Sequence, residues 1–254
     1  FGADMDQRII RAARVFADLD ELSHAVSEEC VRAANEAVSA RGRCLIALSG
    51  GHTPSRAYQI WSTEYRDKMP WAKTHFFWGD ERFVGADDPK SNYHMTREAL
   101  FKNVRVPPEN IHPIVTNFST PDEAAREYEA VLRTFVAESG PSFDVVLLGL
   151  GVEGHTASLF PGSPALAEQK RWVVSVRAPA DPPVRISLTF PVLRRARATY
   201  FLVAGADKQG IVAALRRDPS AETEELPVAM LRPEGEEIWF LDRAADGAMS
   251  QKRA

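Results

Sequence analysis

The segment with the clearest chemical potential is a glycine-rich stretch around one histidine, Gly149-Leu-Gly-Val-Glu-Gly-His-Thr-Ala-Ser-Leu-Phe-Pro161. It follows the apolar run 143–148, which predicts a fully buried strand. Open α/β sheets place their ligands at the ends of such strands, and a histidine there can act as general base or acid near neutral pH. His155 is therefore a candidate catalytic residue. A turn histidine that only bonds its neighbours is the alternative that this spacing leaves open.

A second cluster, Leu48-Ser-Gly-Gly-His-Thr-Pro54, predicts an anion site where a strand passes into a helix. We expect the helix to have Thr53 as its N-cap and Pro54 as its first residue. Free amides at a helix N-terminus bind phosphate, and glycines allow the anion to approach the backbone. The predicted contacts come from Ser49, Gly50, Gly51 and Thr53. The pattern is neither a Walker loop nor a dinucleotide fingerprint. A tight strand-to-helix turn without a ligand is the alternative.

A third cluster, Trp78-Gly-Asp-Glu-Arg-Phe-Val84, again places polar residues after a predicted strand. Asp80 and Arg82 could bond a polyhydroxyl substrate or brace each other. A surface ion pair is the competing interpretation, and such pairs are common.

Two further cations belong to the same pattern. Arg185 begins a predicted strand and shares one of its faces with Ser187 and Thr189, so it could hold a phosphate through two hydrogen bonds. Lys208 follows Gly205-Ala-Asp after another apolar strand and could complete the phosphate site. The alternatives are a charge at a sheet edge for Arg185 and a solvated lysine at a helix start for Lys208.

Strands and helices alternate along the chain. The periodicity predicts helices at 21–40, 54–65, 92–101, 120–135 and 208–216. It predicts strands at 43–48, 75–78, 143–148, 172–176, 184–188, 200–203 and 237–241. We expect a Rossmann-like α/β fold over residues 1–254: a single domain with a mainly parallel sheet and helices on both faces. Four predicted strands end in loops that carry glycine and polar residues, so we expect one cleft at that edge.

Composition excludes several other functions. The 254 residues are 44% apolar and 26% charged, as in an ordinary globular protein. A net charge of −4, from 31 basic and 35 acidic residues, argues against nucleic-acid binding. No apolar run is long enough to span a membrane. Cys30 and Cys44 are interpreted as small buried hydrophobes without a disulfide, which fits a cytoplasmic protein. The expected partner is a small molecule, and a monomer is favoured.

Taken together, these segments resemble the 6-phosphogluconolactonase family, within the glucosamine-6-phosphate isomerase/deaminase-like superfamily. The resemblance covers nearly the whole chain, and the His155 segment and Gly-Asp-Glu-Arg are its most specific parts. One departure is Glu153, where the family pattern more often has aspartate, which leaves the positional role of this carboxylate open. The matching segments are 49–54, 78–84, 91–95, 111–113, 143–162, 185–189, 205–208 and 239–242.

The resemblance implies hydrolysis of the δ-lactone of 6-phosphogluconate in the oxidative pentose phosphate pathway, with no cofactor and no metal. His155 would activate a water, and backbone amides or Arg82 would stabilise the oxyanion. The phosphate would rest on residues 49–51, with Arg185 and Lys208 as counter-charges. Asp80 would bond sugar hydroxyls or hold Arg82.

Two alternatives are weighed against the lactonase. An amino-sugar phosphate deaminase of the same superfamily would carry a carboxylate five residues after the histidine, where this chain has Phe160. A non-catalytic sugar-phosphate sensor is disfavoured by the intact Asp80, Arg82 and His155.

Overall fold

The computed structural model of the protein describes residues 9–10, 12–217 and 220–247. Six strands form one sheet in which every pairing is parallel, in the order β1-β9-β8-β5-β2-β3. The strands are β1 (Ala13–Phe16), β2 (Cys44–Leu48), β3 (Thr74–Trp78), β5 (Val145–Leu148), β8 (Ala198–Val203) and β9 (Glu236–Asp242). The expected α/β fold with a mainly parallel sheet is confirmed.

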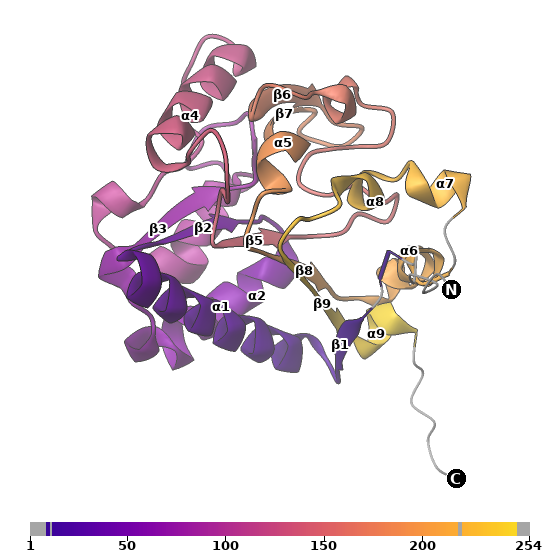
Figure 1. The fold of residues 1–254 in the computed structure, drawn as a ribbon, viewed down its shortest axis with the longest axis horizontal. Helices are drawn as coiled ribbons and strands as arrows, with labels where there is room; N and C mark the ends of the chain where they lie inside the picture. The colour runs from indigo at the N-terminus through magenta and orange to yellow at the C-terminus, as the bar shows by residue number, and fades with distance from the viewer. Residues whose placement is uncertain (1–8, 11, 218–219, 248–254) are drawn as a thin grey trace.

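Helices cover both faces of this sheet, as expected. Phe76 and Phe77 are consecutive in β3 and therefore point to opposite faces. Phe76 packs against Trp61 of one helix, and Phe77 packs against Phe135 of another, with ring centroids 5.9 and 5.4 Å apart. Figure 1 shows α1 and α2 on one side of the sheet, and α4 and α5 on the other. Their bounds are α1 (Leu19–Arg41), α2 (His52–Glu64), α4 (Pro121–Phe135) and α5 (Phe190–Leu193).

The remaining helical segments are short. They include α3 (Asn92–Thr96), which continues as the π-helical turn η3 (Arg97–Phe101), and η6 (Ala206–Lys208), which leads into α6 (Gln209–Leu215). The last part of the chain adds α7 (Ala221–Glu224), α8 (Pro227–Leu231) and α9 (Arg243–Asp246). Four isolated turns complete the list: η1 (Arg66–Lys68), η2 (Trp71–Lys73), η4 (Pro108–Asn110) and η5 (Pro164–Ala167).

A second, three-stranded antiparallel sheet was not anticipated by the sequence analysis. It has the order β4-β7-β6, with β4 (Asp80–Arg82), β6 (Val173–Arg177) and β7 (Val184–Leu188). The strands at 172–176 and 184–188 exist as predicted, but they do not belong to the parallel sheet. The segment 80–82 is too short and too polar to be recognised as a strand from its sequence, and it forms because β7 supplies its pairing partner.

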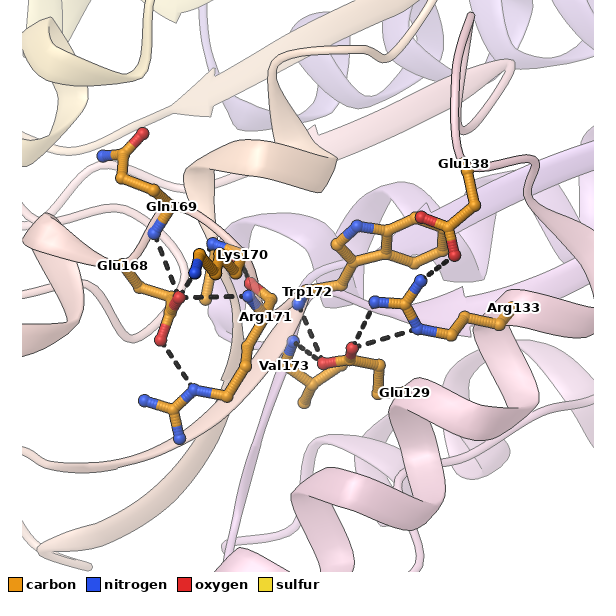
Figure 2. Close-up of polar contacts among 10 residues, drawn as sticks. Glu129, Arg133, Glu138, Glu168, Gln169, Lys170, Arg171, Trp172 and Val173 are labelled. Carbon is orange, nitrogen blue, oxygen red and sulfur yellow. Dashed lines mark hydrogen bonds and ion pairs between the residues drawn. The ribbon is translucent and has the colours of Figure 1, made fainter.

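Helix α4 holds the small sheet in place (Figure 2). Glu129 accepts hydrogen bonds from the backbone N–H groups of Trp172 and Val173, at 2.8 and 3.1 Å, and lies 2.6 Å from a guanidinium nitrogen of Arg133. The same guanidinium lies over the Trp172 ring, 4.1 Å from its centroid. These contacts connect α4, which packs on the main sheet, to Trp172 and to Val173, the first residue of β6. The position of the small sheet is thereby fixed relative to the main sheet.

The predicted start of the second helix is wrong by two residues, and this error affects its N-cap. Helix α2 begins at His52 and not at Pro54, so Thr53 lies inside the first turn and is not the N-cap. The N-cap is Gly51, whose φ of 107° is accessible to glycine but strained for other residues. No side chain caps this end of the helix. The first amides of α2 are therefore not satisfied by a capping side chain.

None of the helices in the described part of the chain combines the length and the apolar character that crossing a bilayer requires.

Candidate active site

The carboxyl ends of β3, β2, β5 and β8 lie side by side, because these strands are neighbours in the sheet. Tyrosines from the flanking helices fix two of these ends. The Tyr58 hydroxyl of α2 bonds both the N–H and the carbonyl of Ser49, at 2.9 Å each. The Tyr128 hydroxyl of α4 bonds the N–H and carbonyl of Trp78, at 2.8 and 3.1 Å. The loops that follow these strands therefore start from well-defined positions.

The loop after β5 carries His155. The N–H of Gly151 donates to the carbonyl of His155 at 2.9 Å, which closes the turn. The imidazole packs on Phe160, with ring centroids 4.4 Å apart. Its Nδ1 lies 3.0 Å from a carboxylate oxygen of Glu153 but makes no hydrogen bond to it, and Nε2 has no partner among the described residues. The side chain is 26% exposed, so a ring nitrogen remains available to a bound molecule.

The loop after β2 forms the uncapped start of α2. Ser49 is buried, and Gly50 and Gly51 follow it. A methyl group placed on Gly50 would lie 1.9 Å from the Oδ1 of Asn92, so only glycine fits at this position. Free amides at the start of a 13-residue helix are suited to an anion, which the helix dipole also favours. The error in the predicted N-cap does not conflict with the predicted anion site. A Thr53 side chain at the N-cap would have competed with an anion for these amides.

Strand β4 presents Asp80 and Arg82. The two carboxylate oxygens of Asp80 accept hydrogen bonds from Ser158 Oγ at 2.5 Å and from Asn92 Nδ2 at 3.2 Å. Arg82 donates to the carbonyl of Lys90 at 2.6 Å, and its Nε is buried without a partner. The idea that Asp80 holds Arg82 is therefore wrong: no hydrogen bond or ion pair joins them.

Glu81, between these two residues, faces away from the cavity. Its buried carboxylate accepts four hydrogen bonds, from the backbone N–H groups of Arg82, Asn92 and Tyr93 and from Ser91 Oγ. Burial raises the pKa of Glu81 above its usual value, and these hydrogen bonds oppose the rise. Glu81 thus connects β4 to the first turn of α3, which places Asn92.

Two cations complete the arrangement. Arg185 is buried in β7, donates from Nε to the carbonyl of Pro182 at 3.1 Å and lies over the Phe160 ring at 5.7 Å. Burial lowers the pKa of Arg185, and the neighbouring Arg82 lowers it further, although a guanidinium remains charged in proteins. Lys208 ends η6, with its Nζ 3.2 Å from a carboxylate oxygen of Asp207.

One cavity of about 490 Å³ collects these groups, a volume typical of small-molecule sites. All nine predicted site residues line it: Ser49, Gly50, Gly51, Thr53, Asp80, Arg82, His155, Arg185 and Lys208. The expectation of one cleft at this edge of the sheet is confirmed, although Arg82 and Arg185 reach it from the small sheet. Within the described chain, no group of three or more histidine, cysteine, aspartate or glutamate side chains is arranged to hold a metal ion.

Three polar residues of the cavity were missed as site residues: His52, Asn92 and Asp207. His52 and Asp207 stand inside clusters that had been singled out, beside the residues chosen there. Asn92 follows β4 by ten residues, and only its place in the segment 91–95 could have indicated it. Its approach to Asp80 depends on the turn of the chain between β4 and α3.

Comparison with known proteins gives a consistent result. The family model of glucosamine-6-phosphate isomerases/6-phosphogluconolactonase matches residues 17–240. The chain is 44% identical to a 6-phosphogluconolactonase of Synechocystis sp., over 83% of this chain and 86% of that protein. A 6-phosphogluconolactonase of Mycobacterium tuberculosis is 40% identical, over 91% of this chain and 95% of that protein. The solved 6-phosphogluconolactonase of Trypanosoma brucei superposes with a TM-score of 0.80 at 31% identity, over 94% of this chain and 98% of that one.

Proposed function

The chain belongs to the family of glucosamine-6-phosphate isomerases and 6-phosphogluconolactonases, and we propose that its cavity hydrolyses 6-phospho-D-glucono-1,5-lactone to 6-phosphogluconate. It is an enzyme of the lactonase type, acting in the oxidative pentose phosphate pathway. The observation that carries the assignment of the site is the meeting of three features in one cavity: His155, two arginines that form no ion pair within the described chain, and an uncapped helix N-terminus.

His155 acts as the general base. Its imidazole takes a proton from a water molecule as the water oxygen bonds to the lactone carbonyl carbon. The carbonyl oxygen becomes an oxyanion, which Arg82 or the backbone amides of the glycine-rich loops stabilise. The bond between the carbonyl carbon and the ring oxygen then breaks, and the ring oxygen receives the proton from His155. The product is the open-chain acid, which loses its proton to water.

The phosphate of the substrate binds at the start of α2 and beside the cations of the same cavity. Ser49, Gly50, Gly51 and Thr53 offer amides and hydroxyls, and the helix dipole of α2 favours the negative charge. Arg185 and Lys208 supply the counter-charges. Because Asp207 already lies beside Lys208, Arg185 is the stronger of the two cations for an incoming anion.

The deaminase alternative is not favoured. Phe160 occupies the place where those enzymes carry a carboxylate, and its ring packs directly on His155 and beneath Arg185. An acidic group could not stand there without replacing this packing. A non-catalytic sensor would bind the sugar phosphate without opening the lactone.

The deciding experiment is a lactonase assay with 6-phosphogluconolactone, corrected for spontaneous hydrolysis. We expect rapid ring opening by the purified protein, and also after exhaustive treatment with EDTA, because the proposed steps need only a base and hydrogen-bond donors. Binding of 6-phosphogluconate without catalysis would favour the sensor. Release of ammonia from glucosamine 6-phosphate without lactonase activity would favour the deaminase.

A cytoplasmic, monomeric protein is part of the same proposal. Cys30 and Cys44 are both buried and free, and burial raises the pKa of each thiol, so neither is positioned for easy oxidation. Size-exclusion chromatography with light scattering tests the monomer.

A further inference from the structure

Ser158 follows His155 by three residues but takes no part in lining the cavity. Its side chain is fully buried, and its hydroxyl donates to Asp80 Oδ2 at 2.5 Å. Its backbone N–H donates to Ser187 Oγ at 3.2 Å. Asp80 and Ser187 are direct partners in the pairing of β4 with β7. Ser158 therefore joins the loop of the main sheet that carries His155 to the small sheet that carries Arg82 and Arg185.

The partner of Ser158 is itself held on its other side. The Asn92 amide nitrogen donates to the carbonyl and to Oδ1 of Asp80, at 2.9 and 3.2 Å. Only the NH₂ of an asparagine can donate to two acceptors, so the orientation of this amide is settled by chemistry. Its Oδ1 then faces Gly50, with no room for a side chain there. Asp80 thus stands where the Gly50 loop, the small sheet and the His155 loop meet.

The backbone next to Ser158 is strained. Ala157, which lines the cavity, has a φ of 48°, in the left-handed region that residues with a Cβ rarely adopt. Such a conformation persists only where the surrounding contacts determine it. Those contacts include Thr156 Oγ1 to the carbonyl of Gly149 at 3.0 Å, and the two hydrogen bonds of Ser158.

We propose that Ser158 is a positioning residue for lactone hydrolysis: through Asp80, its hydroxyl sets the place of His155 relative to Arg82 and Arg185. The inference rests on the proposed function, because it assumes that His155 is the base and that the arginines contact the substrate. The base and the cations belong to different sheets, so their spacing depends on contacts between those sheets. A misplacement of about 1 Å in such a site can lower the rate on the order of 100-fold.

The first test compares Ser158→Ala with Ser62→Ala. Ser62 is also fully buried, but its hydroxyl bonds backbone carbonyls rather than a carboxylate, and it lies in α2 away from the cavity. We expect Ser158→Ala to lower kcat by roughly 10- to 100-fold with KM for 6-phosphogluconolactone nearly unchanged, since the phosphate contacts remain. Ser62→Ala should keep the kcat of the unaltered protein. Ser158→Thr, which retains the hydroxyl, should recover most of kcat.

A second readout does not depend on activity. In a spectrum of histidine-labelled protein, the His155 ring signals should shift in Ser158→Ala and stay in place in Ser62→Ala. If the unaltered protein lacks lactonase activity but these signals shift, the proposed function fails while the positioning contact stands. If the unaltered protein is active and a folded Ser158→Ala keeps its kcat, the proposal is wrong.

Folding failure is also decisive. If Ser158→Ala does not fold, Ser158→Cys replaces it in the test. The cysteine side chain has a similar volume but a weaker hydrogen-bond donor, so this variant should show the loss of kcat. If neither variant folds while Ser62→Ala does, Ser158 is a structural residue and the positioning role is refuted.

Discussion

Arg82 and Arg185 are direct partners across the antiparallel pairing of β4 and β7, and each donates to a backbone carbonyl. Neither forms an ion pair with an acidic side chain in the described chain, although both line the cavity. Two adjacent guanidiniums repel each other, which is why Arg82 contributes to the lowered pKa of Arg185. A bound anion would relieve that repulsion, so the pair is arranged for a negatively charged substrate.

Arg185 and Lys208 should act mainly through the phosphate. A charge-assisted contact to an anion is worth about 1.5 to 3 kcal/mol, so Arg185→Ala or Lys208→Ala should lower kcat/KM for the phosphorylated lactone by roughly 10- to 100-fold. Glucono-δ-lactone has no phosphate, and its slower hydrolysis should change little. The measurement is the ratio of the two substrates in each variant. An equal loss for both substrates would assign these residues to the carbonyl end or to the fold.

Replacing His155 with alanine should remove most of the hydrolysis and leave the fold intact. General base catalysis contributes roughly 10² to 10⁴ in rate, and the imidazole is partly exposed rather than part of the core. Steady-state rates and circular dichroism of the variant provide the check. Turnover close to that of the unaltered protein, in a folded variant, would remove His155 from the mechanism.

Gly151 should be indispensable for a steric reason. A Cβ at this position would lie 1.9 Å from His155 Nδ1 and 2.7 Å from a Glu153 oxygen, so Gly151→Ala must displace the imidazole. We expect kcat to fall on the order of 100-fold with only a modest change in stability. Gly79→Ala is the matched control, because its Cβ would make only an ordinary contact, 3.6 Å from the carbonyl oxygen of Leu48. Similar activity in the two variants would contradict this account.

The pair of His75 and His112, at the edge strand β3, should make stability fall in acid. Their rings stack with centroids 5.4 Å apart, and His75 Nδ1 lies 3.1 Å from His112 Nε2. Burial lowers the pKa of His112 to about 4, and repulsion by His75 adds to the effect; burial also lowers the pKa of His75, next to Arg43. The stabilisation by neutral His112 is complete above the unfolded pKa of about 6.5 and is lost as pH falls toward 4.

We therefore expect His112→Gln to flatten the decline in the free energy of unfolding between pH 7 and pH 4.5, by on the order of 1–2 kcal/mol after allowing for solvent around the half-buried ring. Urea titrations at several pH values measure it. His24 is the control of opposite sign, because its pKa is raised, first by the carbonyl of Asp20 and then by Glu64. The contribution of protonated His24 to the free energy of unfolding is present below pH 6.5 and is lost as the pH rises through the raised pKa of His24. Parallel curves for His112→Gln and the unaltered protein would refute the prediction.

The sequence alone indicated five of the six strands of the main sheet and the chemistry at their ends, whereas β1 (Ala13–Phe16) was not predicted. Apolar runs such as Val145–Leu148 are continuous because both faces of a parallel strand are buried, and this pattern is local and visible. Glycines beside polar residues at four strand ends indicated the cavity, because parallel strands bring their carboxyl ends to one edge. The nine residues selected in this way all line it, and their individual roles remain predictions.

Tertiary structure alone decided how these residues are held. The strand Asp80–Arg82 exists because β7, about a hundred residues away in sequence, pairs with it, and no local propensity encodes such a partner. The hydrogen bond from Ser158 to Asp80 spans 78 positions and determines what the Asp80 carboxylate can still contact. The start of α2 at His52 follows from the left-handed Gly51, which overrides the capping preference of Thr53. The residue types therefore determine which chemistry is available at the cavity. The geometry depends on strand pairings and hydrogen bonds between residues far apart in the sequence, and local sequence patterns do not encode these partners.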